Sequence, residues 1–315
     1  MTRHPFTYLA IFLTVPLALG CLIAPWVYLG IQELAHLPVF SEVAGDRFER
    51  VATRCVQVIA LLLVWPCLRH SGTVDRVAPY LRWDRRRGGA MLRWFGLGVA
   101  TVVVVYAAGL WSGNYVFQPR YAEFWRTAVK PLEILVGALL VGVLEEYLFR
   151  GFIFGVLRSR FSFATAALVS SLFFSGIHFL RPRLAAPPEP VTWLSGFDLF
   201  PHMFTLFRPA YDWDFALTLF LMGLTLCALL ARHGHFYGIA GLHAGWVWAL
   251  QTGSMLVSQE PRHHDFWFGW GNNAAQGALV SLAAFAFAVW AWRALCAYKH
   301  CQHPPVSSTT GACLK

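Results

Sequence analysis

Residues 144–151 read Leu-Glu-Glu-Tyr-Leu-Phe-Arg-Gly, and they place three charges inside a long apolar segment. Residues 134–143 before this stretch carry no charge, and residues 152–157 after it are apolar again. An apolar segment of about 20 residues is long enough to cross a bilayer as a helix. Burying one ion there costs about 2.5–3.5 kcal/mol on insertion scales, so an ionisable residue in such a segment indicates function.

Helical geometry separates the three charges. Glu146 and Arg150 are four residues apart, so they lie on one helix face and can pair. Glu145 is turned by about 100° from Glu146 and projects elsewhere. We therefore predict an internal Glu146–Arg150 ion pair and leave the Glu145 carboxylate for chemistry. The alternative is a structural cluster of all three charges.

Composition places the chain in a membrane. Of its 315 residues 57% are hydrophobic and 13% are charged, and the mean hydropathy is +0.52. A soluble domain has about 45–50% apolar and about 25% charged residues. The apolar runs are long and uninterrupted, which favours helices over the alternating strands of a barrel. We predict an all-α polytopic transmembrane helix bundle that forms a single membrane domain over residues 1–315.

About eight spans are predicted from the apolar runs. Their approximate ranges are 6–29, 51–68, 92–110, 131–154, 161–180, 215–230, 237–257 and 274–297. The loop over 181–214 is the longest, and its density of aromatic residues is typical of a membrane interface. The other loops are too short to hold a soluble domain.

The net charge of +9 is explained by membrane orientation. Seven arginines lie in the loop over 69–93, and short basic loops stay on the cytoplasmic side. Alternation of the spans then places both termini in the cytoplasm, and a bacterial inner membrane fits this pattern. We expect no nucleic-acid partner. The seven cysteines form no Cys-x-x-Cys pair, so neither a disulfide framework nor a zinc knuckle is indicated.

Two further spans carry histidine at membrane depth. His178 ends the motif Phe174-Ser-Gly-Ile-His178, and His243 lies in the glycine-rich stretch 241–248. Two histidines and an unpaired glutamate in one bundle favour a shared site, because each would otherwise need its own partner. Three glycines near these histidines would let the helices approach closely, namely Gly176, Gly241 and Gly245. The histidines in the short loops, His233, His235, His263 and His264, are interpreted as solvated.

A glutamate and two histidines support two kinds of hydrolysis. Glu145 could act as general base on a water that His178 orients, while His243 stabilises the oxyanion. The same three residues could instead bind zinc, which would activate the water. Both routes cleave a peptide bond.

At these residues the sequence resembles the CAAX protease and bacteriocin-processing enzyme family, also called abortive-infection-like membrane proteases. The family motifs Glu-Glu-x-x-x-Arg and Phe-x-x-x-His match at 145–150 and 174–178. His243 matches the third motif, but Val247 stands where the family often has asparagine. The resemblance covers about 131–257, which we predict to be the catalytic core.

The resemblance implies an intramembrane endopeptidase with Glu145 as base and His178 as its partner. It implies supporting roles for Glu146, Arg150 and Phe174, and an oxyanion site at His243. Trp246 or Trp248 could supply the N–H donor that the missing asparagine would have given. The glutamate mechanism needs no cofactor, and we favour it over zinc because no second-shell acid for the histidines is evident.

The expected partners are the lipid bilayer and a membrane-associated protein or peptide substrate. Relatives in this family cleave prenylated proteins, bacteriocin precursors or membrane-anchored tails. Two other functions stay open from the residues alone: a non-catalytic membrane immunity or partner protein, and a transporter or proton relay. The absence of internal symmetry in the sequence argues against the transporter.

Overall fold

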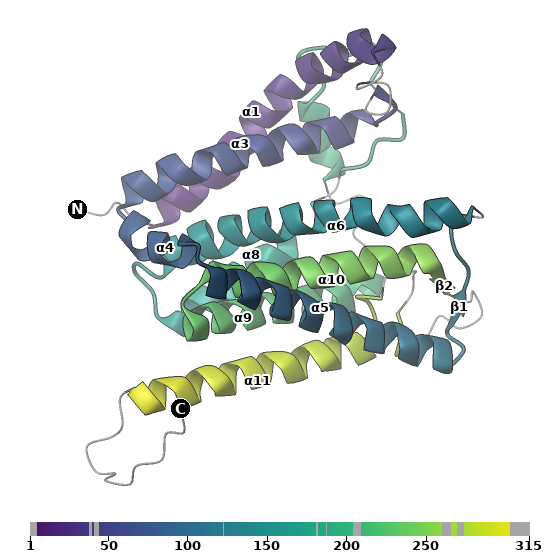
Figure 1. The fold of residues 1–315 in the computed structure, drawn as a ribbon. Helices are drawn as coiled ribbons and strands as arrows, with labels where there is room; N and C mark the ends of the chain where they lie inside the picture. The colour runs from purple at the N-terminus through teal and green to yellow at the C-terminus, as the bar shows by residue number, and fades with distance from the viewer. Residues whose placement is uncertain are drawn as a thin grey trace. The chain divides into compact units, whose positions relative to one another are not determined.

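The computed structural model describes residues 5–37, 40, 44–121, 123–180, 182–186, 188–203, 209–259, 266–269 and 274–302. These residues are almost entirely helical, as predicted (Figure 1). The long elements are α1 (Pro5–Glu33), α3 (Phe48–Ser71), α5 (Arg85–Trp111), α6 (Phe124–Glu146), α8 (Phe163–Ile177), α9 (Pro209–His233), α10 (Phe236–Leu256) and α11 (Ala278–Gln302). Each overlaps one of the eight predicted spans.

Among the described residues, six helices are long and apolar enough to cross a membrane. They are α1, α3, α5, α6 with its continuation to Leu157, α9 and α11. Helix α8 is apolar but has 15 residues, and α10 has 21 residues without reaching the hydropathy of the six. The polytopic helical bundle is therefore confirmed.

Short elements connect the helices. They are η1 (Leu34–His36), α4 (Val74–Leu81), β1 (Tyr115–Phe117), the π-helix η2 (Tyr147–Phe154), α7 (Gly155–Leu157), η3 (Phe197–His202) and β2 (Val257–Gln259). Strands β1 and β2 pair antiparallel, with Tyr115 opposite Gln259. This ribbon joins the ends of α5 and α10.

Two boundaries differ from the prediction. Helix α6 begins at Phe124 rather than near Pro131, which is the eighth residue of the helix. Helix α8 ends at Ile177, so His178 lies in the turn after the helix and not inside a span.

The chain divides into two compact units, which are described separately. The first unit comprises Met1–Asp75, Gly155–Ser162 and Gly176–Arg208. In it α1 packs along α3, and a Cβ added at Gly20 would lie 2.8 Å from Cα of Val56. Leu184 and Leu199 join the buried core of these two helices, so part of the loop predicted for the membrane interface is core.

The second unit comprises Arg76–Phe154, Phe163–Ser175 and Pro209–Lys315. Helix α10 lies between α5 and α6, and α9 pairs with α11 (Figure 1). A Cβ at Gly241 would collide with the carbonyl oxygen of Met91, and one at Gly245 with that of Phe95. The predicted close approach at these glycines is thus confirmed. It is wrong for Gly176, where an added Cβ would meet no described atom within 4 Å.

Candidate active site

A buried ion pair lies at the junction of α6 and η2. Glu146 ends α6, Arg150 lies in η2, and Nη1 of Arg150 is 2.8 Å from Oε1 of Glu146. Their side chains are 0% and 1% exposed, so neither charge is solvated by bulk water. The pair predicted from the spacing of four residues is present.

Three helical segments enclose the Arg150 guanidinium. Its central carbon lies 4.6 Å from the ring centroid of Phe174 on α8, and Nη2 donates to the Gly223 carbonyl on α9 at 3.2 Å. The fully buried Cys227 thiol lies beside the same guanidinium. Cation–π contact and charge-assisted hydrogen bonding compensate for the lost hydration of the charge.

His243 on α10 is bound to the same carboxylate. Its Nδ1 lies 2.8 Å from Oε1 of Glu146, and the ring packs edge-on against Phe174 with centroids 5.7 Å apart. Because an ionised carboxylate paired with arginine only accepts hydrogen bonds, Nδ1 of His243 carries the proton. Glu146 thereby fixes the orientation and tautomer of the imidazole.

Glu145 faces the other ring nitrogen. Its Oε2 lies 3.8 Å from Nε2 of His243, and its side chain is 30% exposed where that of Glu146 is 0%. This separation is too long for a hydrogen bond and suits a bridging water. The two adjacent glutamates therefore occupy different environments, as the helical geometry predicted.

His178 belongs to the first unit, where it is half-buried in the turn after α8. Its role beside Glu145 stays a prediction. The structure brings together Glu145, Glu146, Arg150, Phe174 and His243, all in the second unit.

The two indoles suggested as replacements for the missing asparagine are engaged elsewhere. Nε1 of Trp246 donates to Oγ1 of Thr101 at 3.0 Å, and Nε1 of Trp248 donates to the Pro131 carbonyl at 2.8 Å. Neither N–H is available to an oxyanion in this arrangement, so that suggestion is wrong for this structure. Val247 is half-buried and offers no side-chain donor.

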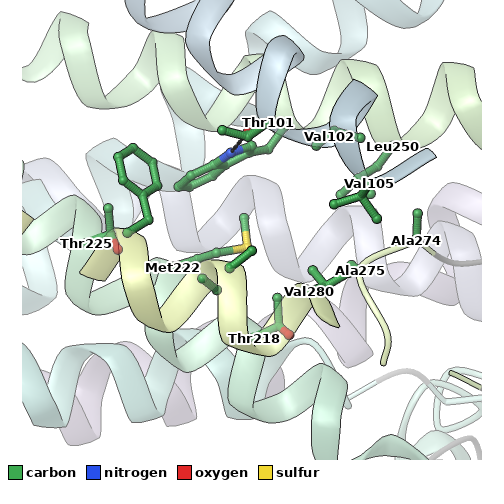
Figure 2. A pocket seen from close by; sticks show the side chains of 14 residues that line it. Thr101, Val102, Val105, Thr218, Met222, Thr225, Leu250, Ala274, Ala275 and Val280 are labelled. Atoms are coloured by element: carbon green, nitrogen blue, oxygen red, sulfur yellow. Dashed lines mark hydrogen bonds between the residues drawn. The ribbon is translucent and has the colours of Figure 1, made fainter. Parts of the chain in front are cut away.

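A cavity of about 100 Å³ lies among α5, α9, α10 and α11 (Figure 2). Its walls are mostly apolar, and they include Trp246, Met222 and Phe287. Thr101, which the figure labels in the cavity wall, accepts the Trp246 hydrogen bond. Of the residues suggested for the site only Trp246 lines this cavity, and none of Glu145, Glu146, Arg150, Phe174 and His243 does.

Metal-ligating side chains are few at this site. The described residues contain no group of three or more histidine, cysteine or acidic side chains arranged to hold a metal ion. Oε1 of Glu146 already accepts from Arg150 and His243. In the second unit, Oε2 of Glu145 and Nε2 of His243 are two possible metal-ligand atoms that face each other.

Two features of the site are missing from the prediction. The Gly223 carbonyl that accepts from Arg150 is a backbone group, and no side-chain motif marks it. The widened π-turn from Tyr147 to Phe154 carries Arg150, and π-turns often occur at functional sites. The adjacent glutamates at the start of this turn are the one local sequence signal.

Comparison with protein-family models gives a match over residues 127–249 to the family described as type II CAAX prenyl endopeptidase, Rce1-like. The matched segment contains every residue of the cluster described above, and also His178. A comparison with curated proteins gave no match.

Proposed function

Because the chain belongs, through residues 127–249, to the Rce1-like family of type II CAAX prenyl endopeptidases, we propose that it is an intramembrane endopeptidase in which Glu145 activates water. The family is that of CAAX membrane proteases, as the three sequence motifs predicted. With six long apolar helices the chain is an integral membrane protein, and its substrate is a membrane-associated protein.

The arrangement of Glu145, His243 and Glu146 supports this mechanism best. Nε2 of His243 and Oε2 of Glu145 lie 3.8 Å apart, so one water placed beside the pair could hydrogen-bond to both. Glu145 takes a proton from this water while the water oxygen attacks the scissile carbonyl carbon. The proton then passes to the leaving amine as the C–N bond breaks. His178 is proposed to orient the same water.

His243 stabilises the oxyanion only when both ring nitrogens carry a proton. Nδ1–H is committed to Glu146, so donation to an oxyanion requires a second proton on Nε2. Oxyanion stabilisation by His243 is therefore proposed for the ring that carries both protons, which the Glu146 and Glu145 carboxylates would face.

The water-only mechanism is proposed in preference to zinc chemistry, because the glutamate mechanism needs no cofactor. A catalytic zinc site needs three protein ligands, so zinc would require His178 beside Glu145 and Nε2 of His243. The expectation that the histidines lack a second-shell acid is wrong for His243, whose Nδ1 is bonded to Glu146. A bound zinc would lower the pKa of its water and so supply the nucleophile itself. Dialysis against EDTA separates the two versions: unchanged cleavage supports the glutamate type, whereas loss with recovery on added zinc overturns it.

A prenylated carboxyl-terminal peptide is the proposed substrate class, which the family description suggests. The proposed location is a bacterial inner membrane with both termini cytoplasmic, from the basic loop over 69–93. A non-catalytic immunity or partner protein is the competing function, and it predicts binding without cleavage.

The direct assay uses the full-length protein in nanodiscs and a quenched fluorescent peptide that ends in a farnesylated CAAX sequence. We expect release of the residues beyond the prenylated cysteine, and slower release from the same peptide without its farnesyl group. Binding of the peptide with no cleavage would favour the non-catalytic function. Equal cleavage of both peptides would support the protease function and show that the prenyl group is not required.

A further inference from the structure

One end of the second unit gathers basic side chains from several helices. The arginines that we call the arginine collar are Arg82, Arg85, Arg86, Arg93, Arg232 and Arg293. All except Arg232 are exposed, and Arg232 is half-buried. The collar comes from segments 76–94, 232–237 and 290–298, in which Asp84 is the single acidic residue.

Contacts between these segments build the collar as one surface. The ring of Trp94 lies 5.4 Å from His233 and 6.4 Å from Trp290, so the first half of α5, the end of α9 and the middle of α11 meet. Nη1 of Arg232 donates to the Ala294 carbonyl at 2.6 Å, which ties α9 to α11.

The turn before α5 is docked on the start of α10. Trp83 packs edge-on against Tyr237 with centroids 4.8 Å apart, and the Tyr237 hydroxyl donates to the Leu81 carbonyl at 2.8 Å. Arg87 holds the turn from within, since it donates to the Pro79 carbonyl at 3.2 Å and pairs with Asp84 at 3.3 Å. The Asp84 carboxylate is thus paired with Arg87 within the turn. The side chains of Arg82, Arg85 and Arg86 are exposed.

Large apolar side chains are exposed directly beside these arginines. Trp83 is 62% exposed, and Leu92, next to Arg93, is 72% exposed. A ligand that covers both kinds of surface must carry an anionic head and a hydrocarbon tail. Guanidinium groups bind phosphate oxygens in pairs, and tryptophan is enriched at the level of lipid headgroups.

We propose that the arginine collar is a binding surface for anionic phospholipid headgroups. The surface draws on the first third of α5, the end of α9 and the second half of α11, and each arginine near an anionic headgroup layer would add to the attraction. This inference is independent of the proposed protease mechanism, because no collar residue belongs to the cluster around Glu146.

The test is native mass spectrometry of the full-length protein titrated with phosphatidylglycerol or with phosphatidylcholine. The variant R82Q/R85Q/R86Q should bind phosphatidylglycerol more weakly, by about fivefold for each arginine removed, with phosphatidylcholine binding unchanged. The matched control R120Q/R126Q/K130Q removes the same charge from the connection and first turns of α6, and should leave both affinities as they are.

Three results would overturn the proposal. The first is equal phosphatidylglycerol binding by the collar variant and the unaltered protein, and the second is an equal loss in both variants. The third is binding of soluble decaglutamate as tight as that of the lipid, which would assign the surface to an acidic polypeptide. If the collar variant does not fold, the unaltered protein still tests the idea, because its preference for phosphatidylglycerol should fall between about 50 mM and 500 mM salt.

Discussion

Nδ1 of His243 donates a hydrogen bond to Oε1 of Glu146 at 2.8 Å, although the two residues lie 97 positions apart in the chain. The same oxygen accepts from Nη1 of Arg150 at 2.8 Å. Oε1 of Glu146 therefore binds both the Arg150 guanidinium and the His243 imidazole, whose other nitrogen faces Glu145. Glu146 is a positioning residue, and its loss should affect both stability and cleavage.

Replacing Glu146 with glutamine should destabilise the protein strongly. The amide leaves the buried Arg150 charge uncompensated, and breaking a buried pair costs about 3–5 kcal/mol. Thermal unfolding of the full-length protein in detergent measures the loss. Glu133→Gln is the control on the same helix, since that side chain is 57% exposed and its pair with Lys130 contributes little. Equal melting temperatures for the two variants would contradict the arrangement.

Replacing Arg150 with lysine should also destabilise the protein, although the charge is kept. Lysine cannot bond both Glu146 and the Gly223 carbonyl with a planar fork, and it loses the stacking on Phe174. We expect a loss of about 1–3 kcal/mol. Arg126→Lys, at a side chain 68% exposed in a surface pair, should be neutral. A neutral effect at Arg150 would mean that charge alone is required there.

Gly245→Ala should separate α5 from α10. The new methyl group would collide with the Phe95 carbonyl, and overpacking of this kind costs about 1–3 kcal/mol. Gly96→Ala on α5 is the matched control, because its Cβ would meet no described atom within 4 Å and alanine favours the helix. Thermal unfolding should therefore show a lower midpoint for Gly245→Ala alone. A midpoint that is unchanged or raised would contradict the close contact.

Acidification should weaken the start of α10 through His235. Its Nδ1 accepts a hydrogen bond from the Gly238 N–H at 3.3 Å, so protonation removes the cap of the helix. Burial, followed by the nearby Arg87, lowers the pKa of His235 below its ordinary 6.5, while Asp84 opposes this shift. The neighbouring His233 ring, 5.9 Å away, also faces it.

Because the pKa of His235 is lowered in the folded protein, the folded state binds fewer protons at this ring than the unfolded state does. The contribution of His235 to the free energy of unfolding is therefore present above pH 6.5 and is lost as the pH falls below that value. His235→Asn keeps a capping oxygen and does not titrate. Melting temperatures at pH 8 and at pH 5.5 should therefore fall less in this variant than in the unaltered protein. An equal fall in melting temperature in both proteins would show that the cap does not titrate. Of the four loop histidines interpreted as solvated, His233 is exposed and His235 is half-buried and caps α10, so the interpretation is wrong for His235. His263 and His264 lie outside the described residues.

Local features of the site could be predicted from the sequence, because they depend on spacing within one helix. The spacing of four positions from Glu146 to Arg150 brings the charges together, and this prediction is confirmed although the helix widens into a π-turn after Glu146. The spans followed from the same kind of local pattern, since an apolar run of membrane length forms a helix in lipid.

Features that depend on packing between helices could not be predicted. The hydrogen bond from His243 to Glu146 could not be predicted from the residues of either helix, because it requires α10 to lie beside α6 in one register. The Gly223 carbonyl is invisible to side-chain motifs. The end of α8 at Ile177 places His178 in a turn, whereas the nearest charge and proline, Arg181 and Pro182, come four and five residues later.

The proposed mechanism is tested most directly by the cleavage rate of Glu145→Gln in nanodiscs with the farnesylated peptide. Glutamine keeps the size of the side chain and removes the base, so we predict a loss of about 10²–10⁴-fold with a melting temperature close to that of the unaltered protein. Glu133→Gln should cleave at the normal rate. Normal cleavage by Glu145→Gln would contradict the assignment of this carboxylate as the group that activates water.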